Sequence, residues 1–263
     1  MMPPSRLLVL VALFLSCTVP ALRAAEPNAK KAPAPAPGGF QSRVFTDSGG
    51  KAHPFWVFVP GPAANPAGTR PPVMLFLHGS GERGTNALDP LLTGIAGAVW
   101  TRKAKFPFVV VIPQAAPNGN WLVDGPDAQR ALGMLRQIQQ ELSTDPARVV
   151  LTGLSMGGSG SWSIAAQNPA AWSAVVPLCG RGDPATAAKF AAAKLPVWSF
   201  CGDKDTPATV EANRTMAAAL KAAGVDARYT EYPGVPHNCW DQAYATDELY
   251  TWMLAQRRTS AQP

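Results

Sequence analysis

The sequence is poor in charged residues, in histidine and in cysteine. Only 15% of its 263 residues are charged, and it holds three histidines and four cysteines. Together with 47% hydrophobic residues, this composition excludes a disordered chain, a coiled coil and a collagen-like repeat. A chain of this length buries a large core without the help of disulfides or metals. We therefore expect a single α/β domain of ordinary size.

Long apolar runs are also missing, apart from one at the N-terminus. Residues 1–25 combine an early positive charge, the apolar stretch Leu7–Leu15 and small residues before position 26. This layout is typical of a cleaved secretory signal, and the run is shorter than the roughly 20 residues of a membrane-spanning helix. We expect an exported protein, periplasmic or secreted, with no transmembrane segment after signal removal. Lipidation at Cys17 is the alternative.

An Ala/Pro-rich segment, residues 26–39, follows the signal and is expected to be an extended linker. The folded domain is then predicted over residues 40–258, with a tail at 259–263. The formal net charge of +6 falls to +3 when residues 1–39 are left out. No basic stripe with interleaved aromatic residues remains, so the sequence predicts no nucleic-acid partner.

Short apolar runs alternate with helical patterns along the domain. An antiparallel hairpin is expected at 41–46 and 53–59, because both segments flank the turn-forming tetrapeptide Asp-Ser-Gly-Gly. Strands are predicted at 73–77, 108–112, 149–152, 174–178, 197–200 and 228–232. Helices are predicted at 89–102, 127–142, 156–167, 185–192, 209–223 and 240–257. The alternation predicts a three-layer α/β fold with a mostly parallel sheet, in which ligands bind at the carboxyl ends of the strands.

The most informative motif is Gly-Leu-Ser-Met-Gly at residues 153–157. It matches G-x-S-x-G and lies between a predicted strand and a predicted helix, which is the context of a nucleophile elbow. In that setting Ser155 projects above the sheet at a helix N-terminus, where partial positive charge favours a developing anion. A structural serine in a tight turn is the alternative reading of the motif.

A serine nucleophile needs a neighbouring base, and the three histidines limit the choice. His53 lies in the hairpin, and His78 is expected to shape the loop that it opens. His237 follows the last predicted strand in a loop rich in Gly and Pro, and it is the only histidine after Ser155. We therefore assign His237 as the base.

The acid that orients the base is sought after the strand predicted at 197–200. Asp203 and Asp205 are the candidates, and we prefer Asp205 because it directly precedes the next helix. Asp203 is expected to form a turn or to pair with Lys204. The order Ser155, Asp205, His237 is that of the α/β-hydrolase fold, whereas the chymotrypsin and subtilisin triads use other orders.

The oxyanion that forms during acyl transfer needs preorganised N–H donors. The first predicted donor is the backbone N–H of Met156, the residue after the nucleophile. The second is expected from the loop after strand 73–77, with Ser80 preferred and Gly81 next. A nucleotide-binding reading of this glycine-rich loop fails, because neither phosphate-binding glycine motif is present.

The chain resembles the α/β-hydrolase superfamily over residues 41–257. The stretches that carry the resemblance are HGSGERG, TGLSMGGSGSW, CGDKDTPATVEANRTMAAALKAAG and YTEYPGVPHNCWDQAY. Within the superfamily it is similar to the secreted phospholipase/carboxylesterase or predicted-peptidase group, relatives of dienelactone hydrolase, polyhydroxybutyrate depolymerase and feruloyl esterase. Dienelactone hydrolases have a cysteine nucleophile where this chain has Ser155, so the resemblance does not imply that activity.

The resemblance implies hydrolysis of a carboxylic ester through an acyl-enzyme on Ser155, with a small-molecule or polymer-borne ester as substrate. It implies no metal and no organic cofactor. A secreted peptidase, an acyltransferase with the same triad and a non-catalytic hydrolase-fold binding protein are the alternatives. Trp121 and Trp240 are candidates for substrate binding, with aromatic packing as the other reading.

Three cysteines, Cys179, Cys201 and Cys239, remain after signal removal, so at most one disulfide forms and one thiol is left over. The sequence does not choose the pair. No insertion is long enough for a large lid, and we expect an open site. The sequence does not determine the oligomeric state.

Overall fold

The computed structural model describes residues 38–66 and 68–258. The predicted signal segment 1–25, the linker up to residue 37 and the tail 259–263 lie outside the described residues. No helix among the described residues is long and apolar enough to cross a bilayer.

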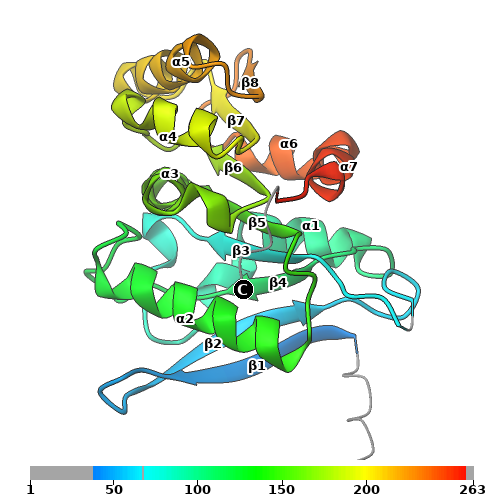
Figure 1. Ribbon diagram of the computed structural model, residues 1–263. Helices are drawn as coiled ribbons and strands as arrows, with labels where there is room; N and C mark the ends of the chain where they lie inside the picture. Colours follow the sequence, from blue (N-terminus) through cyan, green and yellow to red (C-terminus); the bar gives the residue numbers. More distant parts are fainter. Residues whose placement is uncertain (1–37, 67, 259–263) are drawn as a thin grey trace, which may run out of the picture. The chain divides into compact units, whose positions relative to one another are not determined.

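One eight-stranded sheet forms the centre of the described domain, in the order β1-β2-β4-β3-β5-β6-β7-β8 (Figure 1). β1 and β2 form the predicted antiparallel hairpin, β2 also pairs antiparallel with β4, and every other pair is parallel. The strands are β1 (Gly39–Thr46), β2 (Ala52–Val59), β3 (Val73–Leu77), β4 (Val109–Ile112), β5 (Val149–Leu154), β6 (Ala174–Leu178), β7 (Val197–Gly202) and β8 (Ala227–Tyr232). The prediction of a mostly parallel sheet with an N-terminal hairpin is confirmed.

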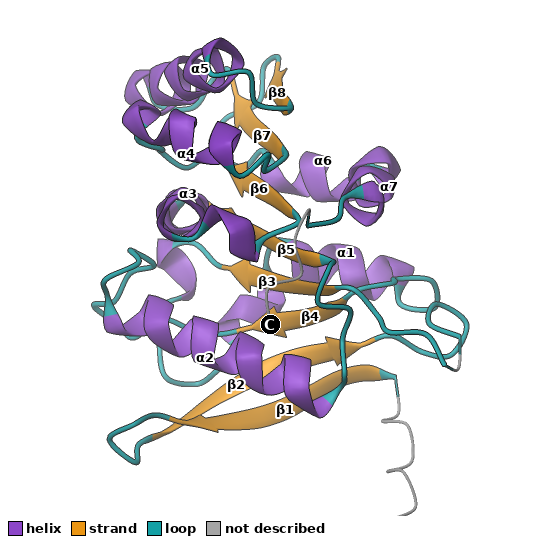
Figure 2. Cartoon of the chain, viewed as in Figure 1, coloured by secondary structure: helices purple, strands orange, loops and turns teal. Residues whose placement is uncertain are grey.

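Helices cover both faces of the sheet (Figure 2). One apolar cluster joins one face of the strands to α2 (Pro126–Glu141), α3 (Met156–Gln167), α4 (Ala187–Ala192) and α5 (Pro207–Ala222). A second cluster joins the other face to α1 (Ile95–Arg102), α6 (Trp240–Ala245) and α7 (Asp247–Ala255). Because both faces are covered, β3 to β7 are buried along their whole length, which explains their mostly apolar sequences.

The pattern of α2 shows how the sequence creates a helix and its burial. Ala131, Met134, Leu135 and Ile138 are all buried, and their spacing of three and four residues places them on one helix face. Each buried Leu, Ile or Met contributes about 1.5–3 kcal/mol relative to an exposed position. Pro126 at the first turn is compatible with the helix start, because its missing N–H has no intrahelical role there.

Two predicted helices are interrupted. The segment 89–102 is a 3₁₀ turn, η2 (Asp89–Leu92), followed by α1. Gly94 separates them with φ of +60°, and a side chain there would collide with Phe76 and Leu154. The segment 240–257 divides into α6 and α7 at Thr246, whose extended backbone ends one helix and begins the next. Hydrophobic spacing alone does not reveal either break.

Candidate active site

The G-x-S-x-G motif forms the turn from β5 into α3. Ser155 has φ of +54° and ψ of −114°, a conformation that non-glycine residues rarely adopt. A Cβ on Gly153 would lie 2.5 Å from the carbonyl oxygen of Gly157, and one on Gly157 would overlap the carbonyl oxygen of Leu77. The two glycines therefore permit the close approach that holds Ser155 in its strained turn.

A continuous hydrogen-bonded relay links the three predicted catalytic side chains. His237 Nε2 lies 2.8 Å from Ser155 Oγ, and His237 Nδ1 lies 2.6 Å from Asp205 Oδ2. The other carboxylate oxygen of Asp205 accepts a 2.6 Å hydrogen bond from the backbone N–H of Thr206. The Asp205 side chain is 1% exposed, whereas that of His237 is 46% exposed. The arrangement gives a buried acid, an orienting contact and a base that opens to solvent.

Asp203 stands outside the relay and holds the neighbouring loop in place. Its Oδ1 accepts a 2.7 Å hydrogen bond from the N–H of Gly234, in the loop that carries His237. Lys204 N–H also donates to Val235 O at 2.9 Å. Asp203 forms the expected ion pair with Lys204, at 3.7 Å. These contacts clamp the loop after β8 onto the loop after β7, and so hold the base beside the acid.

His78 and His53 lie outside the relay. His78 is fully buried, its Nδ1 lies 2.6 Å from Gly79 O, and its Nε2 accepts from the N–H of Ala115 at 2.9 Å. Burial lowers the pKa of His78 to about 4, so the neutral ring serves as a fixed link between the loops after β3 and β4. His53 pairs with Asp47 at 2.7 Å in the hairpin.

The predicted oxyanion donors belong to the start of α3 and to the turn after β3. Met156 is the first residue of α3, where backbone N–H groups have no intrahelical acceptor. Gly79 packs against Ser155, since a Cβ on this glycine would lie 3.6 Å from Ser155 Cβ. Ser80 and Gly81 follow in the exposed turn η1 (Ser80–Glu82). Among the described residues, the N–H groups of Met156 and Ser80 donate to no backbone acceptor.

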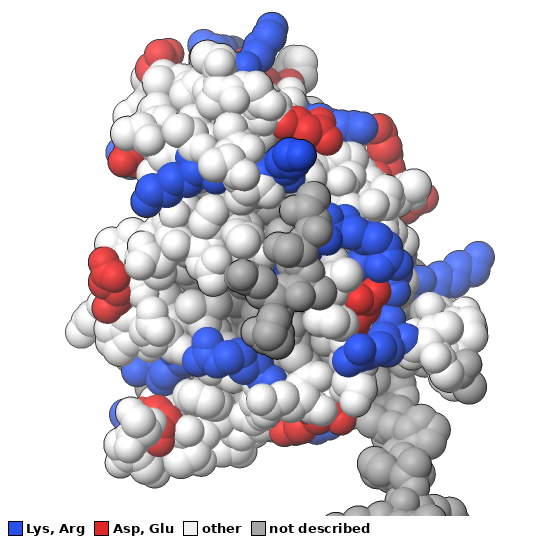
Figure 3. Space-filling model, viewed as in Figure 1, with Lys and Arg blue, Asp and Glu red and all other residues white. Residues whose placement is uncertain are grey.

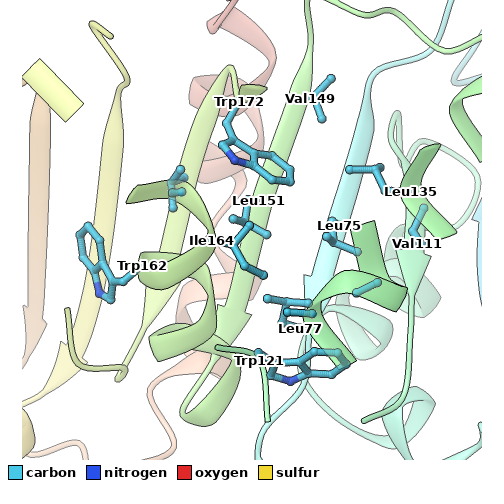
Figure 4. Packing of buried hydrophobic residues seen from close by; sticks show 14 of the residues in the cluster. Leu75, Leu77, Val111, Trp121, Leu135, Val149, Leu151, Trp162, Ile164 and Trp172 are labelled. Carbon is cyan, nitrogen blue, oxygen red and sulfur yellow. The ribbon is translucent and has the colours of Figure 1, made fainter. Parts of the chain in front are cut away.

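The two candidate tryptophans differ in position. Trp240 is partly exposed and packs edge-on against His237, with 5.7 Å between the ring centroids. Trp121 is 1% exposed, and its indole N–H donates to His78 O at 2.9 Å. Figure 4 shows it beside Leu77 within the buried cluster. Its placement as a substrate-contacting residue is therefore corrected: the ring supports the loop after β3 from inside the core.

The three cysteines of the domain are free and buried. The Cys179 sulfur lies within 4.8 Å of ligand atoms of Asp205 and His237, the one such group among the described residues that has the donors for a metal ion. A hydrogen bond with Cys239 and burial raise the pKa of the Cys179 thiol, which keeps it protonated. Asp205 and His237 already hydrogen-bond each other, so the group is arranged as a relay with a neighbouring thiol.

Sequence reasoning missed several supporting groups. The N–H of Thr206, the glycine Gly79 and the thiol of Cys179 all lie at the site, yet none belongs to the motif that identified it. Gly202 is another: a side chain there would overlap the carbonyl oxygens of Val235 and Pro236. The close packing of the two loops becomes visible only in the folded chain.

Comparisons with known proteins agree with this geometry. Residues 121–248 match the model of the Dienelactone hydrolase family, a span that includes Ser155, Asp205 and His237. No curated protein matches the chain.

Solved structures give the wider match. A thermostable esterase is 29% identical, with a TM-score of 0.71; the match covers 83% of this chain and 63% of the esterase. The fluorophosphonate-binding serine hydrolase F of Staphylococcus aureus is 16% identical, with a TM-score of 0.65, over 83% of this chain and 99% of the other. A ferulic acid esterase is 18% identical, with a TM-score of 0.60, over 82% and 96% of the two chains.

The last two matches support the fold alone, while the family model and the esterase at 29% identity connect the fold with hydrolases of the esterase type. The eight-stranded sheet, the hairpin and the helices on both faces are shared architecture. The chain therefore has the α/β-hydrolase fold.

Proposed function

We propose that this protein is a serine esterase that cleaves carboxylic esters through an acyl-enzyme on Ser155. The observation that carries the proposal is the relay from Ser155 through His237 to Asp205, with contacts of 2.8 and 2.6 Å. The thermostable esterase at 29% identity supports an ester as the substrate.

In the first half-reaction, Ser155 Oγ attacks the carbonyl carbon of the ester while its proton moves to His237 Nε2. Asp205 stabilises the resulting imidazolium through His237 Nδ1–H. The carbonyl oxygen becomes an oxyanion and accepts hydrogen bonds from the N–H groups of Met156 and Ser80, with Gly81 as the alternative second donor. The intermediate collapses, the alcohol leaves with the proton from Nε2, and the acyl group stays on Ser155.

In the second half-reaction, a water molecule gives a proton to His237 Nε2 and attacks the acyl carbon. The second oxyanion collapses, Ser155 Oγ recovers a proton from Nε2, and the carboxylic acid leaves. The partly exposed ring of Trp240 flanks His237 and is assigned to contact the leaving alcohol. The exposed imidazole edge gives water access without a lid movement.

The proposal is tested with p-nitrophenyl acetate and butyrate. Ser155→Ala is expected to lower kcat by about 10⁴-fold or more, because it removes the nucleophile. The matched control is Ser159→Ala, a serine one helical turn further along α3 whose hydroxyl accepts a hydrogen bond from Arg181 N–H. Equal rates for wild type and Ser155→Ala would exclude the nucleophile assignment. A panel of feruloyl and acetyl-xylan esters and a peptide then identifies the substrate class.

We also propose that residues 1–25 direct export to the periplasm or the medium. The support is the sequence layout of that segment. N-terminal sequencing of the protein recovered from producing cells tests it: a mature chain beginning near residue 26 is expected, and an intact N-terminus would contradict it. A lipid on Cys17 would give a blocked N-terminus in the membrane fraction.

A further inference from the structure

A cavity lies at the opposite edge of the sheet from Ser155. Its volume is about 540 Å³, and Val149, the first residue of β5, contributes to its wall. Ser155 follows the last residue of the same strand, so the two places are about 20 Å apart at the rise of an extended chain. The volume lies within the range of small-molecule binding pockets. Figure 4 shows Val149, Trp172, Ile164 and Leu135, four of its lining residues, around the start of β5.

Three arginines and no carboxylate line this cavity. Arg70, Arg136 and Arg258 belong to its wall, and none of them forms an ion pair with a carboxylate of the described residues. Burial lowers the pKa of Arg258. Figure 3 shows several Lys and Arg side chains on the face in view, with Asp and Glu side chains among them. The cavity therefore has the charge of an anion site.

Three buried polar atoms without hydrogen-bond partners belong to residues of the same wall. Thr144 Oγ1, Trp172 Nε1 and Arg258 Nε are buried and have no hydrogen-bond partner among the described residues, and all three residues line the cavity. Thr144 is 2% exposed and Trp172 is 4% exposed. An unsatisfied buried polar group costs about 1–3 kcal/mol. Three such groups in residues of one wall mark this part of the core as incompletely satisfied.

The rest of the wall is apolar. Leu135, Val149 and Ile164 are buried beneath the cavity, and Leu132 is partly buried beside them. A bare inorganic anion would leave this surface without a contact, whereas a ligand with a hydrocarbon or aryl body would cover it. Guanidinium groups bind carboxylates and phosphates through paired hydrogen bonds.

We propose that this cavity is a second, non-catalytic binding site for an amphipathic organic anion, whose carboxylate or phosphate head meets the arginines and whose apolar body lies on the leucine, valine and isoleucine wall. The site is independent of the triad, because it lies at the other end of β5. A carboxylic acid with an apolar chain is the first ligand to examine.

The test is calorimetric titration of the full chain with octanoate, octyl phosphate, inorganic phosphate and octylammonium. Saturable binding of octanoate or octyl phosphate is expected, and the tighter of the two identifies the head group. Octylammonium is expected not to bind. Inorganic phosphate binding as tightly as both octyl anions would overturn the proposal, because the apolar wall would then have no part.

The affinities of two variants, Arg136→Gln and Trp172→Phe, test whether the ligand binds in this cavity. Each is expected to weaken binding by tenfold or more, the first by removing a charge and the second by removing part of the aromatic wall. Arg136 is exposed on α2, so its replacement leaves the core intact even where Trp172→Phe does not fold. Lys221→Gln removes one positive charge from an exposed position on α5 and is expected to bind like wild type. Unchanged affinity in Arg136→Gln and Trp172→Phe, or no binding of either octyl anion, would overturn the site.

Binding at Ser155 is separated by a chemical block. Wild type treated with phenylmethylsulfonyl fluoride, and Ser155→Ala without treatment, are both expected to keep the affinity for the octyl anion. Loss of binding in both would place the anion at the triad and overturn the proposal. Because this readout is affinity, failure of the proposed esterase activity leaves the result for the cavity unaffected.

Discussion

The polar groups at the two ends of β5 differ in whether they have hydrogen-bond partners. After the carboxyl end, Ser155, His237 and Asp205 satisfy one another in a relay of short contacts. Around the amino end, Thr144, Trp172 and Arg258 keep buried polar atoms without partners among the described residues. A relay whose members are already bonded is preorganised for chemistry and needs no ligand to order it. The unsatisfied polar atoms at the amino end belong to residues of the cavity that we propose as an anion site.

A second contrast lies within the carboxyl edge, between its two histidines. His78 and His237 both follow strands, and each uses both ring nitrogens in hydrogen bonds. Burial and two backbone partners make His78 a fixed structural link. His237, by contrast, is exposed to solvent and has two side-chain partners, Ser155 and Asp205. Surroundings, rather than place in the fold, separate the two roles.

The largest loss of activity in this comparison is expected to distinguish Asp205, within the relay, from Asp203, outside it. Asp205→Asn is expected to lower kcat/KM for p-nitrophenyl butyrate by about 10³–10⁴-fold, because it removes the charge that stabilises the imidazolium. Asp203→Asn is expected to cost less than tenfold, because the amide oxygen still accepts from Gly234 N–H. Steady-state kinetics on both variants makes the comparison. A greater loss in Asp203→Asn would reverse the assignment of the acid.

The region around Asp203 and Asp205 shows which features of the site can be predicted from the sequence. The order of Ser155, Asp205 and His237 and their positions after strands were predictable, because a parallel sheet collects its loops at one edge. The choice of Asp205 over Asp203 rested only on its place before a helix. The clamp made by Asp203 on Gly234 joins residues 31 apart, and nothing local in the sequence encodes that pairing.

Prediction from the sequence failed for features that depend on which residues the fold buries. Trp121 lies in a polar, glycine-rich segment and resembles a surface residue, yet the fold encloses it beneath His78. The cavity at the start of β5 was not foreseen either. Its lining comes from α2, β5, α3, residues near 172 and Arg258, and arginines that far apart in the chain form no motif.

The next effect concerns two helical glycines. Gly157→Ala is expected to destabilise the protein by about 3 kcal/mol or more, because its methyl group would overlap the backbone carbonyl of Leu77. Gly97→Ala is the matched control on α1: no atom lies within 4 Å of its added Cβ. It is expected to stabilise by about 0.5–1 kcal/mol, since alanine favours helix. Urea unfolding measures both, and equal midpoints would contradict the close approach at the elbow.

The structural histidine gives a pH effect of similar size. The pKa of His78 is about 4 in the folded chain against an ordinary 6.5, so the unfolded state binds a proton that the folded state does not. Its contribution is complete above pH 6.5 and is lost as the pH falls toward 4, on the order of 3 kcal/mol. Urea unfolding from pH 7 to 4 should show a steeper decline for wild type than for His78→Asn.

The same titration is checked directly in the folded protein. The C2 proton resonance of His78 should not move between pH 7 and 5, whereas an exposed histidine would titrate there. A resonance that titrates near 6.5 would refute the role of His78 as a buried neutral link. This measurement needs no variant, so it holds even where His78→Asn does not fold.

The smallest expected effect tests the separation between the two ends of β5. Arg136→Gln is expected to change kcat and KM for p-nitrophenyl butyrate by less than twofold. The start of β5, which lines the same cavity as Arg136, is roughly 20 Å from Ser155 by the length of the strand, more than two Debye lengths at physiological ionic strength. Saturating octanoate should likewise leave the rate of wild type unchanged. Any direct competition of octanoate with the ester at the active site is measured in Arg136→Gln, and this inhibition is subtracted from the result for wild type. A larger change that depends on Arg136 would show that the anion site and the relay are coupled through the sheet. The two ends of β5 would then not be independent sites.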